Sequence, residues 1–400
     1  MPSLSATLER FQPSAIAEIF SLAVRLKEEG RDIVNLSSGE PDFDTEANAK
    51  QAAVEAIAEG QTKYTNIDGT TALKRAIQAK FRRDNSLDYR SEQILVDAGA
   101  KPLLAHGMQA ILDPGDEVII PTPCWTSYVG MARLFGGEPK LVPCPEEAGF
   151  KLQPEDLERA ITRRTKLILL NSPCNPTGAA YAEDELKALT DVLRRHDHVW
   201  IFADDIYEHI VYDGFRFVTP AQVEPRLFDR TLTINGVSKA YAMTGWRIGF
   251  AGGPTRLIEA IRKVLTQSTA NPCSISQAAA TEALTGPQDF LVERADSFRQ
   301  RRDLVVGAIN QMPGLRCSPP EGAFYLYPNC AGLLGRRTEE GATIESSHDF
   351  ARHLLEHWGV AVVPGSAFEC DPYFRLSYAA STTELEEACR RIGRACGELI

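Results

Sequence analysis

The stretch INGVSKAYAMTGWRIG occupies residues 234–249 and places Lys239 in a loop of small residues between two apolar runs. The runs are short enough to be strands of a buried sheet, and Arg247 stands at the start of the second one. Glycines in the loop would let a ligand approach the backbone. A lysine that loses its proton can form an imine, and an arginine can hold a phosphate through two hydrogen bonds. On these residues alone, an imine-forming site and an ordinary surface lysine both remain open.

Strand and helix patterns alternate over most of the chain. The strands expected from apolar runs lie at 94–96, 117–120, 139–142, 166–170, 199–203, 231–234 and 247–251. Helical spacing is found at 46–59, 70–84, from 101 onward, and at 125–135, 154–162, 183–196 and 255–284. Apolar strands separated by helices are typical of a mostly parallel sheet covered on both faces. The predicted fold class is therefore α/β.

The two ends of the chain have a different pattern. A helical pattern at 14–29 precedes a turn-rich loop at 37–43. The C-terminal third contains helical patterns at 290–311, 348–357 and 382–398, and short strands at 323–327, 360–363 and 374–378. This mixture suits a smaller α+β domain. We therefore expect a large domain at 50–285 and a small domain formed by 1–49 together with 286–400.

Composition excludes several classes of protein. The 400 residues include 43 Lys and Arg against 54 Asp and Glu, a net charge of −11, and there is no basic tract. We therefore expect neither nucleic acid nor a membrane as a partner. Nine cysteines without a C-x-x-C pair indicate reduced thiols, and Cys124 and Cys174 read mainly as space-filling side chains. With no apolar leader in residues 1–10, the expected location is the cytoplasm.

The sequence VDAGAKP, residues 96–102, is a strand followed by a tight turn and a helix that begins near a proline. The free N–H groups at such a helix start can bind an anion. Many α/β proteins have similar turns without a ligand, so this signal is weak by itself. The turn does not match the G-x-x-x-x-G-K-[ST] loop of nucleoside triphosphate sites.

Two further loops follow predicted strands. Trp125 could stack on a flat heterocycle, or it could simply anchor the core. Asn175 precedes a proline, which favours an extended backbone and leaves the amide free to enter a pocket. The alternative is that this amide caps its own turn.

Acidic and phenolic groups lie at the end of another strand, in ADDIYE, residues 203–208. Open α/β sheets bind ligands at this end. Asp204 could keep a pyridine nitrogen protonated, and Tyr207 could bind the ring hydroxyl, both of which suit pyridoxal phosphate. Adjacent acids could also suggest a metal, but no His or Cys completes a ligand set at suitable spacing, so we expect none.

Arg375 lies within the otherwise apolar strand FRLSY, residues 374–378. A buried guanidinium needs an anionic partner. The partner could be a protein carboxylate in a salt bridge or a substrate carboxylate held by two hydrogen bonds.

Five strings together resemble the fold-type I pyridoxal-phosphate enzymes, and among them the class I aminotransferases of the bacterial aspartate and prephenate subgroup. The strings are SSGEPDF at 37–43, NPTG at 175–178, DDIYE at 204–208, SKAYAMTGWRIG at 238–249 and FRLSY at 374–378. The similarity extends from about Pro13 to about Arg391. The resemblance implies a homodimer with shared active sites and a ping-pong exchange of an amino group between an amino acid and a 2-oxo acid.

The resemblance also assigns roles. Lys239, Asp204 and Tyr207 are the implied catalytic residues, with Lys239 forming the imine and moving a proton. The implied coenzyme contacts are Gly99, Ala100, Lys101, Trp125, Asn175, Asp204, Tyr207, Ser238, Lys239 and Arg247, with Tyr64 reaching across from a second subunit. The implied substrate contacts are Gly39, Trp125, Asn175, Arg375, Lys101 and Arg10.

Lys101 and Arg10 bear on substrate choice. Both match positions that relatives use near the substrate side chain, which favours a dicarboxylic donor such as aspartate or glutamate, with 2-oxoglutarate, oxaloacetate or prephenate as oxo acid. Arg10 could equally be a solvated side chain near the terminus.

The chain departs from the pattern of similar enzymes beside this expected pocket. Cys124 replaces a tyrosine, and Gly99-Ala100-Lys101-Pro102 replaces Gly-Gly-Lys-Gln. His106 ends the run LLAH, which lacks a usual Phe-Asn pair. An aminotransferase for aromatic or other amino acids therefore stays open.

Three other functions also stay open at this point. They are a lyase that eliminates from sulfur amino acids, a cofactor-sensing regulatory domain, and a Schiff-base aldolase without a cofactor.

Overall fold

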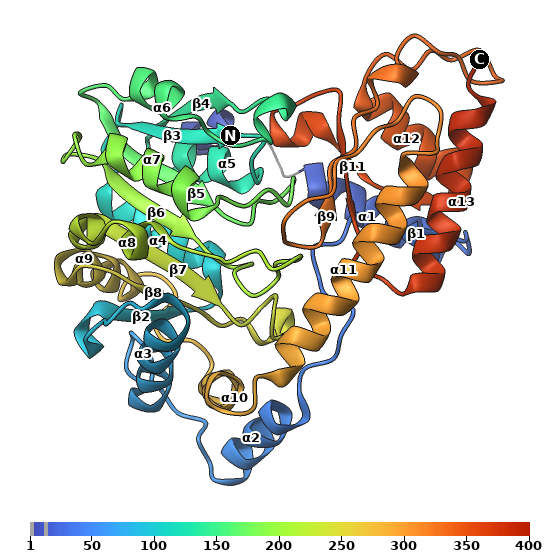
Figure 1. Ribbon diagram of the computed structural model, residues 1–400. Helices are drawn as coiled ribbons and strands as arrows, with labels where there is room; N and C mark the ends of the chain where they lie inside the picture. Colours follow the sequence, from blue (N-terminus) through green and yellow to red (C-terminus); the bar gives the residue numbers. More distant parts are fainter. Residues whose placement is uncertain (1–3, 12–14) are drawn as a thin grey trace.

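The computed structural model describes residues 4–11 and 15–400 (Figure 1). The strands are β1 (Val34–Asn35), β2 (Ile94–Asp97), β3 (Glu117–Thr122), β4 (Glu138–Pro143), β5 (Thr165–Asn171), β6 (Trp200–Asp204), β7 (Thr231–Gly236), β8 (Gly249–Gly252), β9 (Tyr325–Leu326), β10 (Val360–Ala361), β11 (Val363–Pro364) and β12 (Phe374–Ser377). The α-helices are α1 (Ala15–Glu28), α2 (Ala47–Ala58), α3 (Thr71–Asn85), α4 (Ala100–Ile111), α5 (Ser127–Leu134), α6 (Pro154–Ala160), α7 (Glu183–Leu193), α8 (Pro220–Val223), α9 (Thr255–Leu265), α10 (Ser274–Thr285), α11 (Asp289–Ile309), α12 (Ser347–Trp358) and α13 (Thr382–Glu398). Pro13 and Ser14, where the similarity and the first helix were expected to begin, lie outside the described residues.

A seven-stranded sheet forms the centre of the larger part of the molecule, in the order β2-β8-β7-β6-β5-β3-β4. Its strands are parallel except β8, which runs antiparallel to both β2 and β7. The prediction of an α/β fold with a mostly parallel sheet is confirmed.

Helices cover both faces of this sheet, as the apolar strand sequences require. On one face, Leu104 of α4 and Ile261 of α9 belong to one buried cluster with Leu169 and Phe202 from the strands. On the other face, a second cluster joins α6 and α7 to the alternate strand residues. Strands β5 and β6 are apolar over 167–170 and 200–203 and end at Asn171 and Asp204, so each places a polar side chain at the strand end, where loops can carry a site.

The smaller part of the molecule combines the N-terminal segment with the C-terminal third. β1 pairs in parallel with β10, and β9, β12 and β11 form an antiparallel sheet. Beside these strands, α13 packs against both α11 and α12 (Figure 1). These pairings join the regions that were expected to form the small domain, although the boundaries at 50 and 285 stay a prediction.

Two predicted elements are wrong in detail. The single strand expected at 360–363 is two strands, because β10 pairs with β1 whereas β11 pairs with β12 in another sheet. The helical pattern at 255–284 is two helices, α9 and α10. Ala270 adopts a left-handed conformation and Pro272 follows it, so the helix cannot continue between them.

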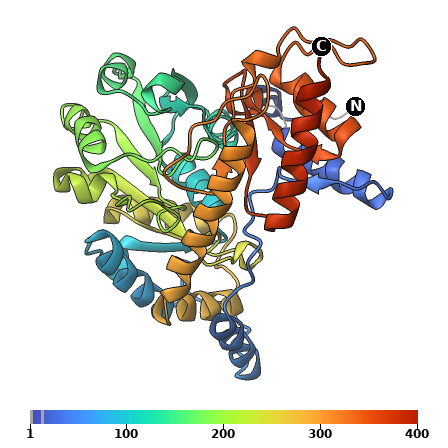
Figure 2. The same ribbon diagram turned by 45° about the vertical axis from the view of Figure 1, so that its right-hand side comes forward.

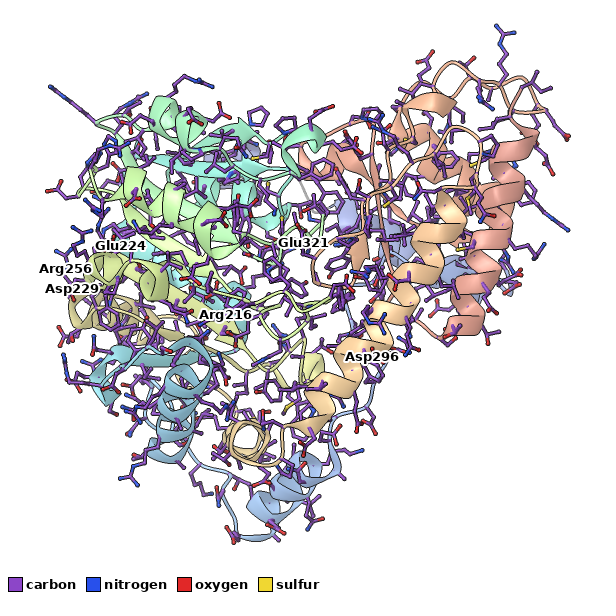
Figure 3. The ribbon with its side chains drawn as sticks, viewed as in Figure 1. Arg216, Glu224, Asp229, Arg256, Asp296 and Glu321 are labelled. Carbon is purple, nitrogen blue, oxygen red and sulfur yellow. The ribbon has the colours of Figure 1, made fainter. Side chains whose placement is uncertain are left out.

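Contacts between the two parts include ion pairs as well as apolar packing. Lys151, which follows β4, lies 3.0 Å from Glu321, which precedes β9. Figure 3 labels Glu321 between the two parts of the molecule.

Helix α2 projects at one corner of the molecule in both ribbon views, where it packs against α10 (Figures 1 and 2). Val54 and Ile57 on this helix are 57% and 55% exposed. Among the helices of residues 4–11 and 15–400, none is both long and apolar enough to cross a membrane.

Strand β8 lies so close to the turn before α4 that its residue Gly249 has no room for a side chain. A Cβ atom on Gly249 would lie 2.3 Å from the carbonyl carbon of Gly99 and 2.4 Å from the nitrogen of Ala100. Gly249 therefore lets β8 approach the turn that precedes α4.

We predict that Gly249→Ala lowers the free energy of unfolding by about 3 kcal/mol, because backbone atoms would have to move. Urea denaturation of the coenzyme-free protein measures this change. Gly307→Ala in α11 is the control, since a Cβ there meets nothing within 4 Å. Equal stability of the two variants would contradict the prediction.

Candidate active site

A cavity of about 430 Å³ opens where the carboxyl ends of the central strands face the smaller part of the molecule. Open parallel sheets bind ligands at this end. The cavity is lined by Ile16, Ser38, Gly39, Glu40, Ala100, Lys101, Trp125, Tyr128, Asn171, Asn175, Asp204, Ile206, Tyr207, Ser238, Lys239, Thr244, Arg247, Tyr325 and Arg375. Most of the site residues expected from the sequence are thus brought together in one place.

Lys239 follows β7 and projects into this cavity. Its Nζ atom donates a hydrogen bond to the carbonyl oxygen of Gly39 at 2.6 Å. Burial lowers the pKa of Lys239 to about 8, and the positive charges of Arg375 and Arg247 act in the same direction. The amine can therefore lose its proton near neutral pH, which a nucleophilic lysine requires.

Asp204 stands at the end of β6 and is 5% exposed. Its Oδ2 atom accepts a hydrogen bond from the Tyr128 hydroxyl at 2.6 Å, while its Oδ1 atom is buried and has no partner among the described residues. Burial raises the pKa of Asp204 to about 6, and the Tyr128 hydrogen bond opposes that rise. A buried carboxylate oxygen without a donor is costly, so this site is suited to a ligand that donates a proton or carries positive charge.

Tyr207 lies three residues beyond Asp204, and its hydroxyl is 2.9 Å from the hydroxyl of Tyr325. Burial, and next the neighbouring Tyr325, raise the pKa of Tyr207 well above its ordinary value. Tyr207 is therefore a neutral hydrogen-bonding group at physiological pH.

Arg375 is 1% exposed and has no carboxylate partner in the described part of the chain. It donates to Oδ1 of Asn175 at 2.8 Å and to the carbonyl oxygen of Ser37 at 2.7 Å, and its Nε atom has no partner. The guanidinium lies over the rings of Tyr325 and Phe368, at 4.5 and 5.2 Å from their centroids. The sequence had left two partners open for Arg375, a protein carboxylate and a substrate carboxylate. The first of these, a salt bridge within the protein, is not found among the described residues.

The turn before α4 supplies an anion-binding surface. Gly99 has φ of 111°, and Arg247 donates to the carbonyl oxygen of Ala98 at 3.1 Å and to that of Thr244 at 2.9 Å. A Cβ on Gly99 would lie 2.6 Å from Nη2 of Arg247. Glycine therefore lets the guanidinium lie against the turn, next to the unpaired N–H groups of the first helical residues.

Lys101 and Trp125 lie on the wall of the cavity. The Lys101 ammonium is 4.8 Å from the centroid of the Trp125 ring, and that ring meets Tyr128 edge-on at 5.4 Å. Partial burial, and next the charge of Arg247, lower the pKa of Lys101.

The charges around the cavity are unbalanced. Within residues 4–11 and 15–400, Lys101, Lys239, Arg247 and Arg375 form no ion pair with a protein carboxylate. A protein with a net charge of −11 thus collects unpaired cations at one pocket. Such a site attracts a ligand with several negative charges.

Three residues expected at the site do not line the cavity. Tyr64 is 93% exposed, and Gly99 lies behind the wall that Ala100 and Arg247 form. Arg10 is 3.1 Å from Glu138 in an ion pair. The roles of Tyr64 and Arg10 stay predictions.

Sequence reasoning missed several wall residues, among them Tyr128, Asn171 and Tyr325. The Asn171 amide accepts from the N–H of Asn175 at 2.9 Å and donates to the carbonyl oxygen of Asp204 at 2.8 Å. Asn171 directly follows the strand predicted at 166–170, and Tyr128 follows Trp125 by three residues, so both had a positional signal. Tyr325 sits in a short apolar run and had none.

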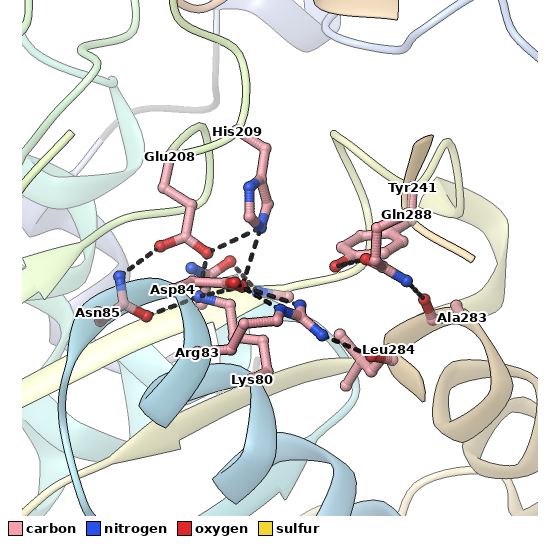
Figure 4. A network of polar contacts seen from close by, with 12 residues as sticks. Lys80, Arg83, Asp84, Asn85, Glu208, His209, Tyr241, Ala283, Leu284 and Gln288 are labelled. Carbon is pink, nitrogen blue, oxygen red and sulfur yellow. Dashed lines mark hydrogen bonds and ion pairs between the residues drawn. The ribbon is translucent and has the colours of Figure 1, made fainter. Parts of the chain in front are cut away.

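A buried polar network supports the loop after β6 from behind (Figure 4). The ammonium of Lys80 on α3 pairs with Glu208 and donates to Oδ1 of Asn85 at 2.7 Å. Asn85 in turn donates to Oε2 of Glu208 at 2.7 Å. The loop that carries Tyr207 is therefore fixed to α3.

Three side chains of this network, Asp84, Glu208 and His209, are close enough together to hold a metal ion. However, their carboxylates are already paired with the network's own cations. Lys80 pairs with Glu208, and Arg83 lies 2.6 Å from Asp84 (Figure 4). The arrangement is therefore explained by internal ion pairing.

Comparison with known proteins identifies the family of this chain. A family model described as aminotransferase class I and II matches residues 31–392. The crystal structure of the aspartate aminotransferase from Rhizobium meliloti is 55% identical, covers 100% of both chains and has a TM-score of 0.97. The aspartate/prephenate aminotransferase of Cereibacter sphaeroides is 54% identical over 100% of both chains. A structure of the aspartate aminotransferase from Thermus thermophilus with maleate is 42% identical, covers 98% of this chain and 100% of its own, and has a TM-score of 0.92.

The chain therefore belongs to the class I and II aminotransferases. It is an enzyme that acts on amino acids and 2-oxo acids, and its coenzyme is pyridoxal phosphate. This family assignment rejects two functions that the sequence had left open, a cofactor-sensing regulatory domain and a cofactor-free aldolase.

The residues of the cavity fit pyridoxal phosphate. The unpaired Oδ1 atom of Asp204 suits a protonated ring nitrogen, and the amine of Lys239 suits an aldehyde. The close approach of Arg247 to Gly99 at the start of α4 suits a phosphate.

We predict that Lys239 in the coenzyme-free protein reacts with acetic anhydride with a midpoint near pH 8 rather than near 10.5, because the neutral amine is the nucleophile. Mass spectrometry of the Lys239 peptide across a pH series measures the midpoint. Arg375→Met should move it upward, since losing a neighbouring positive charge favours the protonated amine. A midpoint near 10.5 in the unsubstituted protein would refute the account of Lys239.

Proposed function

We propose that this aminotransferase moves an amino group between L-aspartate or L-glutamate and 2-oxo acids such as 2-oxoglutarate and oxaloacetate, with prephenate as a further acceptor. The observation that carries the proposal is the set of unpaired cations around the cavity. A phosphate would satisfy Arg247 and the start of α4, which leaves Arg375 and Lys101 for two carboxylates. The prephenate part rests on the similarity to the Cereibacter sphaeroides enzyme.

The α-carboxylate of the substrate binds to Arg375. Its buried guanidinium has a free Nε donor and is held in place by Asn175 and Ser37, so the binding geometry is fixed before the substrate arrives. Lys101 at the cavity wall binds the distal carboxylate. A substrate with two carboxylates is thereby held at both ends.

Coenzyme binding is assigned to residues on the sheet side of the cavity. Arg247 and the turn of Gly99 and Ala100 would hold the phosphate, together with Ser238. Asp204 would keep the ring nitrogen protonated, Tyr207 and Asn175 would bind the ring oxygen, and Trp125 would cover the ring face. When bound, pyridoxal phosphate supplies an electron sink that stabilises the negative charge left at the substrate α-carbon.

Lys239 performs the proton transfer. Its Nζ atom, with a pKa of about 8, can take the proton from the substrate α-carbon as a base and return it as an acid. The hydrogen bond to the Gly39 carbonyl keeps this amine in the cavity between the cations of Arg375 and Arg247. Donor and acceptor use the same site in turn, so the kinetics should be ping-pong.

We predict that the purified protein forms oxaloacetate from L-aspartate and 2-oxoglutarate, and that Arg375→Leu lowers kcat/KM by about 10³-fold because a buried charge partner is lost. Arg375→Lys should recover only part of this loss, since an ammonium cannot make the two-pronged contact. Lys101→Met should lower kcat/KM for L-aspartate by about tenfold and leave that for L-alanine unchanged.

The same assay separates the alternatives. Equal effects of Lys101→Met on aspartate and alanine would reject the dicarboxylate assignment and favour another amino acid class. Release of ammonia from a sulfur amino acid without any oxo acid would indicate a lyase.

We also propose that the enzyme is a homodimer in which Tyr64 completes the active site of the second subunit. The support is the exposure of Tyr64 (93%) together with that of Val54 and Ile57 on α2. Exposed apolar groups of this kind suit an interface between two copies. The free thiols support a reducing compartment, and hence the cytoplasm.

Sedimentation equilibrium tests the dimer. We predict a mass of about twice the chain's 44.0 kDa, and a monomer–dimer equilibrium shifted toward monomer in Ile57→Asp, because a charge would be buried at the interface. A monomer at micromolar concentration would exclude shared active sites.

A further inference from the structure

A buried ionisable pair lies directly beneath the turn that precedes α4. Nδ1 of His106 is 2.7 Å from Oδ2 of Asp97, and Nε2 of the same ring is 3.2 Å from the hydroxyl of Ser268. Asp97 is 1% exposed and His106 is 7% exposed. Neither side chain lines the cavity, and the mechanism above uses neither of them.

Asp97 determines the orientation of the turn. Its Oδ1 atom accepts the N–H of Ala98 at 2.7 Å, and its backbone oxygen accepts the N–H of Gly99 at 2.7 Å. The next peptide, between Ala98 and Gly99, is held at its carbonyl oxygen by Arg247, which donates to the oxygen of Ala98 at 3.1 Å. The two peptides that flank Ala98 are therefore both fixed immediately before α4.

This orientation matters for phosphate binding. Helix α4 begins at Ala100, so the N–H groups of Ala100 and Lys101 have no partner within the helix. Pro102 has no N–H group. The direction of these two backbone donors thus depends on a turn that the Asp97 carboxylate, the Asp97 backbone oxygen and Arg247 hold together.

The carboxylate of Asp97 also creates an electrostatic problem. A buried negative charge next to the turn would repel a phosphate unless a donor compensates it. Besides the turn itself, the groups that face the Asp97 carboxylate are His106 from α4 and the hydroxyl of Thr269, 3.4 Å from Oδ1. Of these, His106 makes the shorter bond, at 2.7 Å against 3.4 Å for Thr269.

We propose that His106 is a positioning residue for coenzyme binding, which holds the Asp97 carboxylate by a hydrogen bond so that the turn of Ala98 to Ala100 accepts the phosphate of pyridoxal phosphate. The inference rests on the proposed phosphate site. It assigns to His106 an effect on the phosphate group alone, since the ring-binding residues Asp204, Tyr207 and Asn175 lie on other strands and loops.

The test compares two ligands that differ only in the phosphate. Dissociation constants of pyridoxal phosphate and of pyridoxal are measured on the coenzyme-free protein by absorbance or tryptophan fluorescence. His106→Leu should weaken pyridoxal phosphate about tenfold, the size typical of losing an orienting partner behind a ligand site. Its affinity for pyridoxal should stay within about twofold, so the preference for the phosphorylated ligand falls.

Three further variants separate positioning from general damage. His106→Asn keeps a donor to Asp97 and should lie between wild type and His106→Leu. The double variant Asp97→Asn/His106→Leu should bind pyridoxal phosphate more tightly than His106→Leu, because it removes the uncompensated charge and so shows coupling between the two positions. His198→Asn, at an exposed histidine bonded to the carbonyl oxygen of Thr162, is the control and should change neither constant.

The outcomes are distinct. If His106→Leu weakens both ligands equally, or neither, the positioning role is overturned while the proposed function stands. If the unsubstituted protein itself does not prefer pyridoxal phosphate to pyridoxal, the phosphate site is wrong and the inference fails with it. Should His106→Leu fail to fold, judged by thermal unfolding, the same comparison is made with His106→Asn and Asp97→Asn, and unchanged ratios in both overturn the inference.

Discussion

The buried guanidinium of Arg375 is the constraint to which the rest of the site is adjusted. In the part of the chain that the structure describes, this charge is 1% exposed and has no carboxylate partner, and Asn175, Ser37 and the rings of Tyr325 and Phe368 surround it. Those four residues come from four separate regions of the chain. The position of Arg375 therefore joins the smaller part of the molecule to the edge of the large sheet, and the same charge lowers the pKa of Lys239.

The parallel sheet explains why so many reactive groups meet at one edge. Strands β5 and β6 at its centre are apolar over 167–170 and 200–203, and each ends in a polar residue at the same edge. β5 ends at Asn171, β6 ends at Asp204, and the loop after β7 carries Lys239. The antiparallel strand β8 starts at this edge, which places Arg247 beside the turn that leads into α4. One topology thus supplies an amine, a carboxylate and two anion-binding groups without any long loop.

Much of this could be predicted from the sequence. The α/β fold, the mostly parallel sheet and the gathering of Lys239, Asp204, Tyr207, Asn175 and Arg375 follow from strand ends and from motifs with fixed spacing. Local patterns could not reveal Tyr325, whose role depends on a pairing of distant strands. Nor could they separate β10 from β11. The single apolar run that contains both strands contributes to two sheets, and its division is determined by which distant strands pair with each half.

Charged groups were the harder part of the prediction. The sequence left open whether Arg375 pairs with a protein acid, since a salt bridge partner can come from anywhere in the chain. Similarly, it gave no sign that Asp97 and His106 form a buried pair, although they are only nine positions apart. Arg10 pairs with Glu138, 128 positions away along the chain, and no local pattern in the sequence indicates that contact.

The proposed role of the Arg375 guanidinium is to bind a carboxylate of the substrate. A crystal structure of the protein with pyridoxal phosphate and an unreactive dicarboxylate such as maleate would test it most directly. The account predicts one carboxylate in a two-pronged contact with Arg375 that includes its Nε atom, and the other carboxylate at Lys101. A dicarboxylate bound elsewhere, with Arg375 paired to an acidic side chain of the protein, would contradict it.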